Sequence, residues 1–250
     1  MQILEHVQLR SESRRNGKNV RLKSVGVRPA QADQARLAST DRRVRILNFT
    51  IALIAIVLLL PLMALIAVAI KLTSPGPVIY TQTRVGLDRR NGNRSPNSGK
   101  RRVDYGGRLF KIYKFRTMVV GADASGEVWA SPNDPRVTRI GRILRQYRLD
   151  ELPQLFNVLK GDMNLVGPRP EQPNIFVELR SRIRGYQERQ RVLPGITGLA
   201  QVSRPYDTSL DDVKRKLELD LEYIRRRSVL TNLGIMLRTV PVILFRQGAW

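Results

Sequence analysis

The stretch Arg148-Leu-Asp-Glu-Leu-Pro-Gln-Leu-Phe-Asn-Val-Leu-Lys-Gly-Asp-Met-Asn-Leu-Val-Gly-Pro-Arg-Pro170 sets two adjacent carboxylates, Asp150 and Glu151, before an apolar segment. Pro153 indicates the first turn of a helix, because proline fits there and costs roughly 3 kcal/mol in a helix interior. The free N–H groups of a first turn favour anions, so we expect both carboxylates to stay ionised and a phosphate to dock beside them. An ionised aspartate beside a phosphate can form an acyl phosphate. The alternative is a capped helix whose acids simply face solvent.

Composition narrows the chemistry further. The chain has 250 residues and carries 44 basic against 21 acidic side chains, a formal net charge of +23. This charge implies an anionic partner, which could be a phosphorylated substrate, an anionic membrane surface or nucleic acid. The chain has no cysteine and a single histidine, His6, which excludes disulfides and cysteine-bound zinc and nearly excludes histidine chemistry. Catalysis would therefore rest on carboxylates, hydroxyls, Lys, Arg or a hard metal ion bound by oxygen.

One segment is long and apolar enough for a membrane. Residues 46–70 carry no charge and would extend about 37 Å as a helix, which is sufficient to cross a bilayer. Pro61 lies inside this segment and predicts a bend. Basic residues flank both ends, Arg45 before and Lys71 after, and the positive-inside rule favours the cytoplasmic side for both. A re-entrant helix that bends and returns satisfies both flanks, and a proline-kinked spanning helix is the alternative.

The segments on either side of the membrane helix have different characters. Residues 1–41 are polar and basic without periodicity, and we expect a disordered tail that touches acidic lipids. Residues 78–82 and 109–118 favour strands, which predicts a hairpin across a long basic loop at 87–108. Asp134 and Pro135 predict the N-cap and first turn of a basic amphipathic helix. Its arginines could lie on lipid phosphates or form a solvated face.

The C-terminal part predicts further helices around a turn. Residues 172–192 indicate one or two basic helices, and residues 193–198 indicate a tight turn. Ser209 and Asp212 form a capping-box-like start of a helix that reaches about residue 227. Residues 229–245 are apolar but interrupted by polar residues and a proline, which suits a helix lying in the membrane interface.

Five stretches together resemble the monotopic polyprenyl-phosphate phosphoglycosyl transferases, the bacterial sugar transferase family. They are residues 110–118 (FKIYKFRTM), 149–163 (LDELPQLFNVLKGDM), 166–170 (VGPRP), 191–202 (RVLPGITGLAQV) and 218–223 (ELDLEY). The resemblance runs from residue 42 to residue 245 and rests on long motifs in a fixed order. Longer relatives carry additional N-terminal membrane helices, so we expect this chain to be a minimal form with a tail.

The resemblance implies an activity and a place in the cell. It implies transfer of a sugar-1-phosphate from a UDP-sugar to undecaprenyl phosphate, at the cytoplasmic face of the bacterial inner (plasma) membrane, which starts surface glycan and exopolysaccharide assembly. It also implies a re-entrant helix, Asp150 as the nucleophile of a covalent phosphosugar intermediate with release of UMP, and Glu151 as a ligand of Mg²⁺. Mg²⁺ prefers one or two carboxylates plus substrate phosphates, which fits this pair. Galactose or glucose phosphate is the expected sugar, with an N-acetylated sugar as the alternative.

Displacement at a pyrophosphate also needs cations, and arginine suits bidentate phosphate contacts. The candidates for phosphate or substrate binding are Lys114, Arg116, Arg148, Arg169, Arg191, Arg204 and Asp220. Arg169 lies between two prolines that restrict its backbone. Arg204 could replace an arginine that the family often carries after the turn at residues 193–198. The alternative for the basic residues is a solvated or merely packed surface, and for Asp220 it is a structural ion pair.

Together these features predict a mainly helical α+β fold with interfacial amphipathic helices and a small β-hairpin around one active site. We expect a basic tail at residues 1–41, a re-entrant membrane helix at 42–72 and a membrane-associated catalytic domain at 73–250. The competing function is a membrane-tethered scaffold that binds anionic lipids or nucleic acid without catalysis. We expect no nucleic-acid partner, because aromatic residues make up only 6% of the chain and no recognition module occurs. A homodimer stays open.

Overall fold

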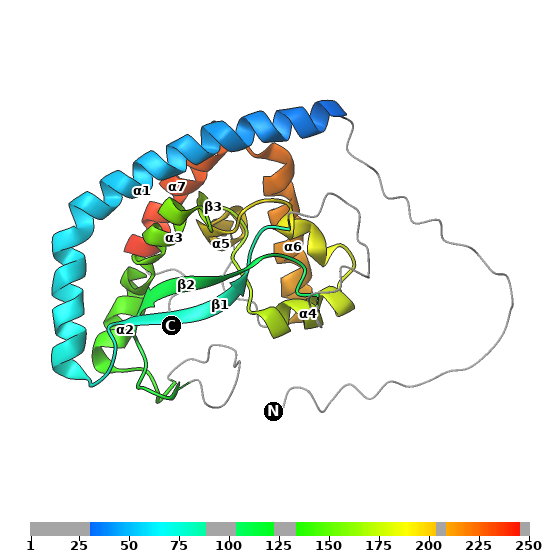
Figure 1. Cartoon of the computed structure of the whole chain (residues 1–250). Helices are drawn as coiled ribbons and strands as arrows, with labels where there is room; N and C mark the ends of the chain where they lie inside the picture. The colour runs from blue at the N-terminus through cyan, green and yellow to red at the C-terminus, as the bar shows by residue number, and fades with distance from the viewer. Residues whose placement is uncertain (1–30, 89–103, 123–133, 204–208, 246–250) are drawn as a thin grey trace, which may run out of the picture.

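The computed structural model describes residues 31–88, 104–122, 134–203 and 209–245, and between residues 31 and 40 it describes the backbone alone. The protein is mainly helical with two small sheets, which confirms the predicted α+β class (Figure 1). The helices are α1 (Gln31–Thr73), α2 (Arg139–Gln146), α3 (Gln154–Lys160), α4 (Pro173–Arg182), α5 (Leu199–Ser203), α6 (Leu210–Arg226) and α7 (Val229–Leu244). The strands are β1 (Ile79–Val85), β2 (Leu109–Phe115), β3 (Asn164–Val166) and β4 (Gly195–Thr197), and two 3₁₀ turns are η2 (Leu149–Glu151) and η3 (Tyr186–Arg191).

Helix α1 is long, apolar and bent. Its part Asp41–Thr73 is long and apolar enough to cross a membrane. Figure 1 shows α1 running along one side of the protein and then turning within its apolar stretch, which contains Pro61. Proline has no N–H for the carbonyl four residues earlier, and its ring crowds that carbonyl. The predicted bend is therefore confirmed, although α1 begins before residue 41, where the predicted tail was expected to end.

The two limbs of α1, one before and one after Pro61, pack on the same globular body. Ala52 and Ile56 of the first limb join the main core, which also contains residues of α3, β3 and α6. Met63 and Ile70 of the second limb pack in a separate cluster with Leu144 of α2. The opposite face of the helix exposes large apolar side chains, namely Leu53, Ile54, Val57, Leu58, Leu60, Leu65, Val68 and Leu72. One face of α1 thus belongs to the protein core, while the other presents a long apolar surface.

Polar contacts fasten the first limb of α1 to the body. Arg45 donates to the backbone carbonyls of Val158 and Leu159, the latter at 2.7 Å, and so places its positive charge on the last turn of α3. Asn48 is fully buried in the apolar part of α1. Its side chain donates to Asn164 Oδ1 at 2.9 Å and accepts from the Leu165 N–H at 3.1 Å. These directional bonds fix where α1 lies along β3.

The predicted hairpin is confirmed and is attached to α3. β1 and β2 pair antiparallel, with Ile79 opposite Phe115. Asn157 of α3 accepts from the Tyr113 N–H at 3.0 Å and donates to the Lys111 carbonyl at 2.7 Å. The free edge of β2 is thereby covered by a helix, which holds the strand in place.

The start of α2 differs from its prediction. Asp134 is not the N-cap, because α2 begins later with Thr138 as its cap, whose hydroxyl accepts from the Gly141 N–H at 3.0 Å. The reason is a tertiary pairing, since Val137 forms an antiparallel bridge with Met118 and keeps this part of the chain extended. A backbone that pairs with a distant strand cannot also form the first turn of a helix.

The turn predicted at residues 193–198 is also wrong in part. Its central residues form β4, which pairs in parallel with β3. The partner strand lies about 30 residues away in the sequence, so no local signal reveals the pairing. Glycine and proline give a turn-like composition to a segment that becomes a short strand.

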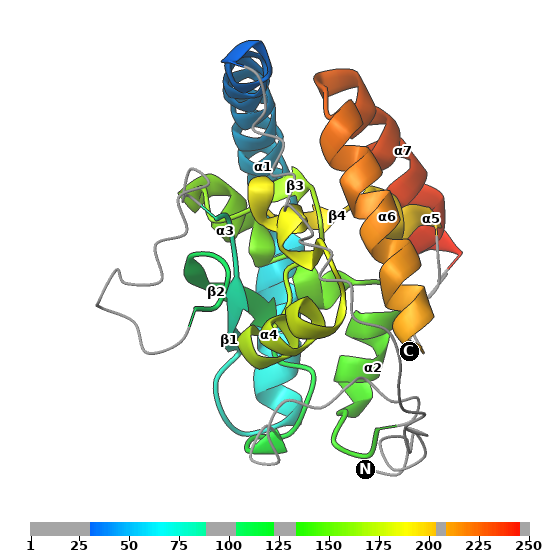
Figure 2. The ribbon, with the colours of Figure 1, turned by 90° about the vertical axis from the view of Figure 1, so that its right-hand side faces the viewer.

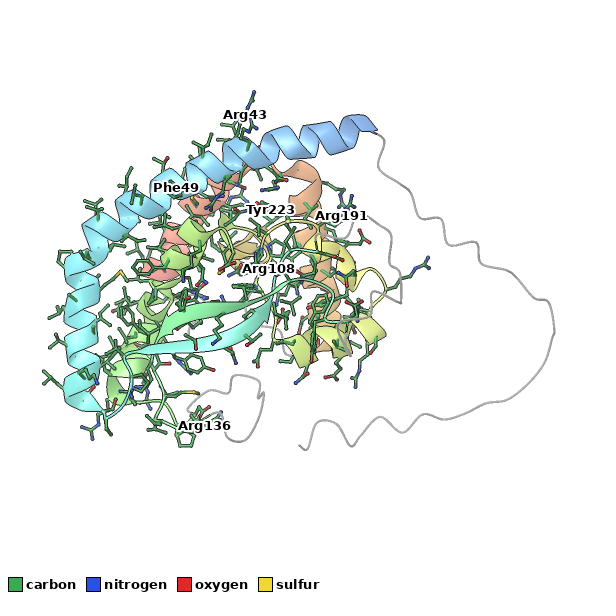
Figure 3. The ribbon with its side chains drawn as sticks, in the orientation of Figure 1. Arg43, Phe49, Arg108, Arg136, Arg191 and Tyr223 are labelled. Atoms are coloured by element: carbon green, nitrogen blue, oxygen red, sulfur yellow. The ribbon has the colours of Figure 1, made fainter. Side chains whose placement is uncertain are left out.

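The C-terminal helices α4, α6 and α7 lie where helices were predicted, whereas the short helix α5 was not predicted. α6 begins at its predicted cap, since the Ser209 hydroxyl accepts from the Asp212 N–H at 3.2 Å. Residues 172–192 form two helical segments, α4 and η3. Figure 2 shows α6 and α7 side by side, and the Tyr223 hydroxyl of α6 donates to Asn232 Oδ1 of α7 at 2.9 Å. Tyr223 lies inside the protein beneath α1, whereas Arg43 points away from the body (Figure 3).

The contact between α1 and β3 generates a stability prediction. Asn48→Ala should lower the free energy of unfolding by about 1–3 kcal/mol, because the Leu165 N–H and the side-chain oxygen of Asn164 stay buried and lose the partners that Asn48 supplies. Thermal unfolding of the detergent-solubilised protein measures this effect. Thr50→Ala is the matched control on the same helix, because Thr50 is exposed. Equal unfolding temperatures for the two variants would contradict the role given to Asn48.

Candidate functional site

The two carboxylates lie in the 3₁₀ turn η2, between α2 and α3, and both are buried, with 7% exposure for Asp150 and 6% for Glu151. They precede α3 instead of occupying its first turn, since Pro153 is the N-cap of that helix. The residue before η2, Arg148, has φ 53° and is the single left-handed residue other than glycine in the described part of the chain. This conformation costs about 1–2 kcal/mol for a residue with a side chain. Such strain is typical of functional sites.

Two cations from distant parts of the chain contact these carboxylates. Lys114 of β2 places its Nζ 3.1 Å from Glu151 Oε1 and 3.5 Å from Asp150 Oδ2. Arg169, in the loop after β3, places Nη2 2.8 Å from Glu151 Oε1. The structure therefore brings four of the predicted site residues together in one cluster, in which the two acids are buried and the two cations are partly exposed. Lys114 bridges both acids, and Arg169 binds the second.

The two carboxyl groups differ in their tendency to ionise. Burial raises the pKa of Asp150, and Glu151 adds to this effect while Lys114 opposes it. Burial acts on Glu151 as well, but Arg169 and Lys114 outweigh it and hold the pKa of Glu151 well below its usual range. The expectation that both carboxylates stay ionised thus applies to Glu151, whereas burial works against it at Asp150. A further cation beside Asp150 would lower its pKa.

The loop that carries Arg169 is held by the small parallel sheet. The Gly195 N–H donates to the Pro168 carbonyl at 3.0 Å, and the Gly167 N–H donates to the Thr197 carbonyl at 2.8 Å. A Cβ atom on Gly195 would lie 2.1 Å from the Gly167 nitrogen, so this close approach of two backbones requires glycine. The strand pair β3–β4 therefore fixes the backbone of the loop that carries Arg169.

A second buried charge network lies behind this loop. Arg189 of η3 is 3.1 Å from Glu171 Oε1 and 2.8 Å from Asp220 Oδ2, and Lys216 Nζ is 3.3 Å from Glu171 Oε1. Burial disfavours the charge of Glu171, but Lys216 and Arg189 hold its pKa below the usual range. Asp220 therefore belongs to a structural ion pair, which was the alternative left open for it, and it is not part of the Asp150 cluster.

Other predicted candidates lie elsewhere. Arg116 is buried and donates to the backbone carbonyls of Ser74, at 2.8 Å, and Pro75, so its guanidinium fastens the segment after α1. Its contact with a phosphate stays a prediction. Arg191 has a side chain that is 48% exposed and pairs with Glu188 on the surface at 3.3 Å. A 3₁₀ helix turns about 120° per residue, so Arg191 and Arg189 face different directions.

Arg148 and Arg204 are the two remaining predicted candidates. Arg148 lies directly before η2, and its charge helps to lower the pKa of Glu151. Arg204 lies outside the residues that the structure describes.

Sequence reasoning missed three arginines near the site. Arg145 of α2 donates to the Thr117 hydroxyl at 2.9 Å and its charge opposes the raised pKa of Asp150. Arg148 lies beyond the end of α2, so the three-residue spacing between these two arginines is not a helical signal that could have identified Arg145. Arg84 and Arg189 bind the loop around Arg169, and nothing local in the sequence distinguishes them from surface arginines.

The carboxylate pair fits a divalent cation only when a substrate supplies further ligands. In the described ranges, no group of three or more His, Cys, Asp or Glu side chains converges. Asp150 and Glu151 can contribute carboxylate oxygens, and Mg²⁺ is commonly held by one or two carboxylates together with substrate phosphates and water. The donor set therefore fits a Mg²⁺ ion shared with a phosphorylated substrate, and Glu151 is the more readily ionised ligand.

The cluster generates a prediction about Lys114. Lys114→Met should lower the free energy of unfolding by about 1–3 kcal/mol, because it removes a cation from two buried acids. The loss is limited because Arg169 remains on Glu151 and Asp150 can take up a proton. Lys111→Met on the same strand is the control, since Lys111 is exposed. Thermal unfolding of both variants in detergent measures the difference, and a loss at Lys111 as large as at Lys114 would refute the assignment.

Comparison with known proteins identifies the family of this chain. The sequence model described as bacterial sugar transferase matches residues 39–246. The chain is 44% identical to the UDP-N-acetylgalactosamine-undecaprenyl-phosphate N-acetylgalactosaminephosphotransferase of Aeromonas hydrophila, over 79% of this chain and 43% of that protein. It is 41% identical to a UDP-glucose:undecaprenyl-phosphate glucose-1-phosphate transferase of Caulobacter vibrioides, over 85% of this chain and 73% of that protein.

A third relative extends the pattern. The chain is 40% identical to the UDP-glucose:undecaprenyl-phosphate glucose-1-phosphate transferase of Escherichia coli, over 77% of this chain and 38% of that protein. It therefore spans less than half the length of the Aeromonas and Escherichia relatives and about three quarters of the Caulobacter protein. Because the family match covers most of the chain and includes the apolar part of α1, the carboxylate pair and the loop of Arg169, this chain belongs to the bacterial sugar transferase family.

Proposed function

We propose that this protein transfers a sugar-1-phosphate from a UDP-sugar to undecaprenyl phosphate, with Asp150 as the nucleophile and UMP as the first product. The observation that carries the proposal is the buried pair Asp150–Glu151 between Lys114 and Arg169. This arrangement, in a family whose cited relatives are named for such transfers, supports phosphoryl chemistry over a non-catalytic scaffold.

The proposed reaction has two displacements at one phosphorus atom. An oxygen of ionised Asp150 attacks the phosphorus that carries the sugar, the pyrophosphate P–O bond breaks, and UMP leaves with the electron pair. Asp150 then holds the sugar phosphate as an acyl phosphate. A phosphate oxygen of undecaprenyl phosphate attacks the same phosphorus, the bond to Asp150 breaks, and the carboxylate is regenerated. No proton is consumed in either displacement.

The surrounding residues have separate roles in this scheme. Lys114 favours the ionised form of Asp150 and contacts both carboxylates. Glu151 would hold Mg²⁺, and the ion would supply charge neutralisation for the phosphates of the donor. Arg169 orients Glu151 and presents a guanidinium suited to bidentate phosphate contact. Preorganised charges of this kind stabilise a transition state without further rearrangement.

We also propose that α1 is re-entrant and that the protein lies on the cytoplasmic face of the bacterial inner membrane. Arg45 near the start of the apolar stretch binds the body, and so does Ser74 directly after the helix, through Arg116. A straight spanning helix would separate its ends by about 30 Å across the hydrocarbon core. Both ends of α1 instead contact one body, and basic residues flank both ends, which supports a shared side.

The last helix supports the same orientation. α7 exposes the apolar side chains of Leu230, Leu237, Val240 and Leu244, and its C-cap residue Phe245 is exposed as well. An amphipathic helix with such a face suits the membrane interface. The exposed faces of α1 and α7 would then lie in lipid, close to a lipid-borne phosphate acceptor. The named sugars of the cited relatives are glucose and N-acetylgalactosamine, so both hexose and N-acetylated donors belong in a substrate panel.

The covalent step can be tested by mass. Incubation with UDP-glucose, UDP-galactose or UDP-N-acetylgalactosamine and Mg²⁺, without undecaprenyl phosphate, should release UMP and add a sugar phosphate to the peptide that contains Asp150. Asp150→Asn should give neither product, and Glu151→Gln should slow the adduct by about 100-fold or more. Asp162→Asn is the matched control and should keep the adduct. Wild-type protein without any adduct, or full turnover by Asp150→Asn, would refute the nucleophile.

The membrane arrangement can be tested by labelling, because the chain has no cysteine of its own. Single cysteines at Thr40→Cys and Thr73→Cys should react with a membrane-impermeant maleimide only after the inner membrane is opened, since both ends of α1 lie on the cytoplasmic side. A periplasmic reporter protein with one cysteine serves as the control for access from outside. Labelling of Thr40→Cys in intact spheroplasts would instead indicate a helix that spans the membrane.

A further inference from the structure

A buried arginine outside the proposed chemistry lies behind the loop of Arg169. The Arg189 side chain is only 1% exposed and contacts three elements of the fold. Its Nη1 is 3.1 Å from Glu171 Oε1, and its Nη2 is 2.8 Å from Asp220 Oδ2 of α6. The same Nη2 donates to the backbone carbonyl of Arg169 at 3.0 Å. Arg189 therefore joins η3, α6 and the loop of Arg169 through one guanidinium.

The contact to Arg169 is part of a wider attachment of the same loop. Arg84 of β1 donates from Nη1 to the Pro170 carbonyl at 3.1 Å. Glu171, the next residue, binds Arg189 and Lys216 together. The backbone of this loop is thus bound by cations through its carbonyls, while the side chain of Arg169 reaches Glu151 at 2.8 Å.

We propose that Arg189 is a positioning residue that fixes the backbone of Arg169, so that the Arg169 guanidinium stays on Glu151 of the reacting pair. This inference rests on the proposed function. A guanidinium offers five donors in a rigid plane, so it can bind two carboxylates and one carbonyl at the same time. A lysine at this position would keep the positive charge and lose that fork.

Charge balance explains why the position tolerates a buried cation. Glu171 and Asp220 are the anions that compensate the charge of Arg189. A neutral residue at position 189 would leave both carboxylates buried without this cation. A lower activity of a neutral variant could therefore result either from lost positioning of Arg169 or from lost folding. Arg189→Lys separates the two, because it retains the charge and changes only the geometry of donation.

The test is a double-mutant cycle on the full chain in detergent with UDP-sugar, undecaprenyl phosphate and Mg²⁺, in which UMP release gives kcat/KM. Arg169→Ala should lower kcat/KM by about 100-fold and Arg189→Lys by about 10-fold. The double variant should be no slower than Arg169→Ala alone, because Arg189 acts through the missing side chain. Arg182→Lys, in an exposed ion pair with Glu178 of α4, is the matched control and should keep wild-type activity.

A merely structural role gives a different result. The losses would then multiply, and the double variant would fall by about 1,000-fold, which would overturn the inference while leaving the proposed function intact. Wild-type protein that releases no UMP would overturn both. If Arg189→Lys does not fold, Glu171→Gln replaces it in the same cycle, because it keeps the side-chain shape and weakens the attachment of Arg189. Losses that multiply for Glu171→Gln and Arg169→Ala would equally refute the positioning role.

Discussion

Two neighbouring carboxylates can be buried as anions only if cations lie against them, and the rest of this structure supplies those cations. Two unit charges 4 Å apart interact by about 4 kcal/mol at an effective dielectric constant of 20, so the repulsion within the pair is comparable to much of a domain's stability. Lys114 comes from the hairpin, and Arg169 comes from the loop after β3. Each must therefore be placed by its own supports. Asn157 holds the hairpin on α3, and the β3–β4 pair holds the loop.

The long apolar helix α1 is built into the same body. Its inner face contributes to two core clusters, and its polar residues Arg45 and Asn48 bind α3 and β3. Since α3 follows directly on η2, the helix that would enter the lipid and the turn that carries the acids are joined by a few contacts. Under the proposed function, this proximity lets a lipid-borne phosphate and a water-soluble nucleotide sugar meet at one side chain. The exposed faces of α1 and α7 would provide the lipid contact. Arg189 binds the backbone of the loop whose Arg169 side chain reaches Glu151.

Features with a local physical cause could be predicted from the sequence. Pro61 bends α1 because proline has no N–H to donate to the carbonyl four residues earlier. Ser209 starts α6 because its hydroxyl accepts from the free Asp212 N–H in the first turn. The hairpin follows from two β-favouring segments. Features that depend on a distant partner could not be predicted. The late start of α2 results from the bridge between Val137 and Met118, and β4 exists only because β3 lies beside it.

The candidate site divides in the same way. The sequence by itself determined the family, the apolar segment with its bend, and the carboxylate pair with Lys114 and Arg169 among its candidate cations, because these are carried by motifs and by residue type. Only the tertiary structure decided which of the many arginines serve which purpose. Arg116 and Arg191 were predicted to bind phosphate, yet Arg116 binds backbone carbonyls and Arg191 faces solvent. Arg189, two residues before Arg191, is buried instead. The physical reason is that a charged side chain takes its role from the partners that long-range packing brings within about 3 Å of it, and sequence spacing does not encode those partners.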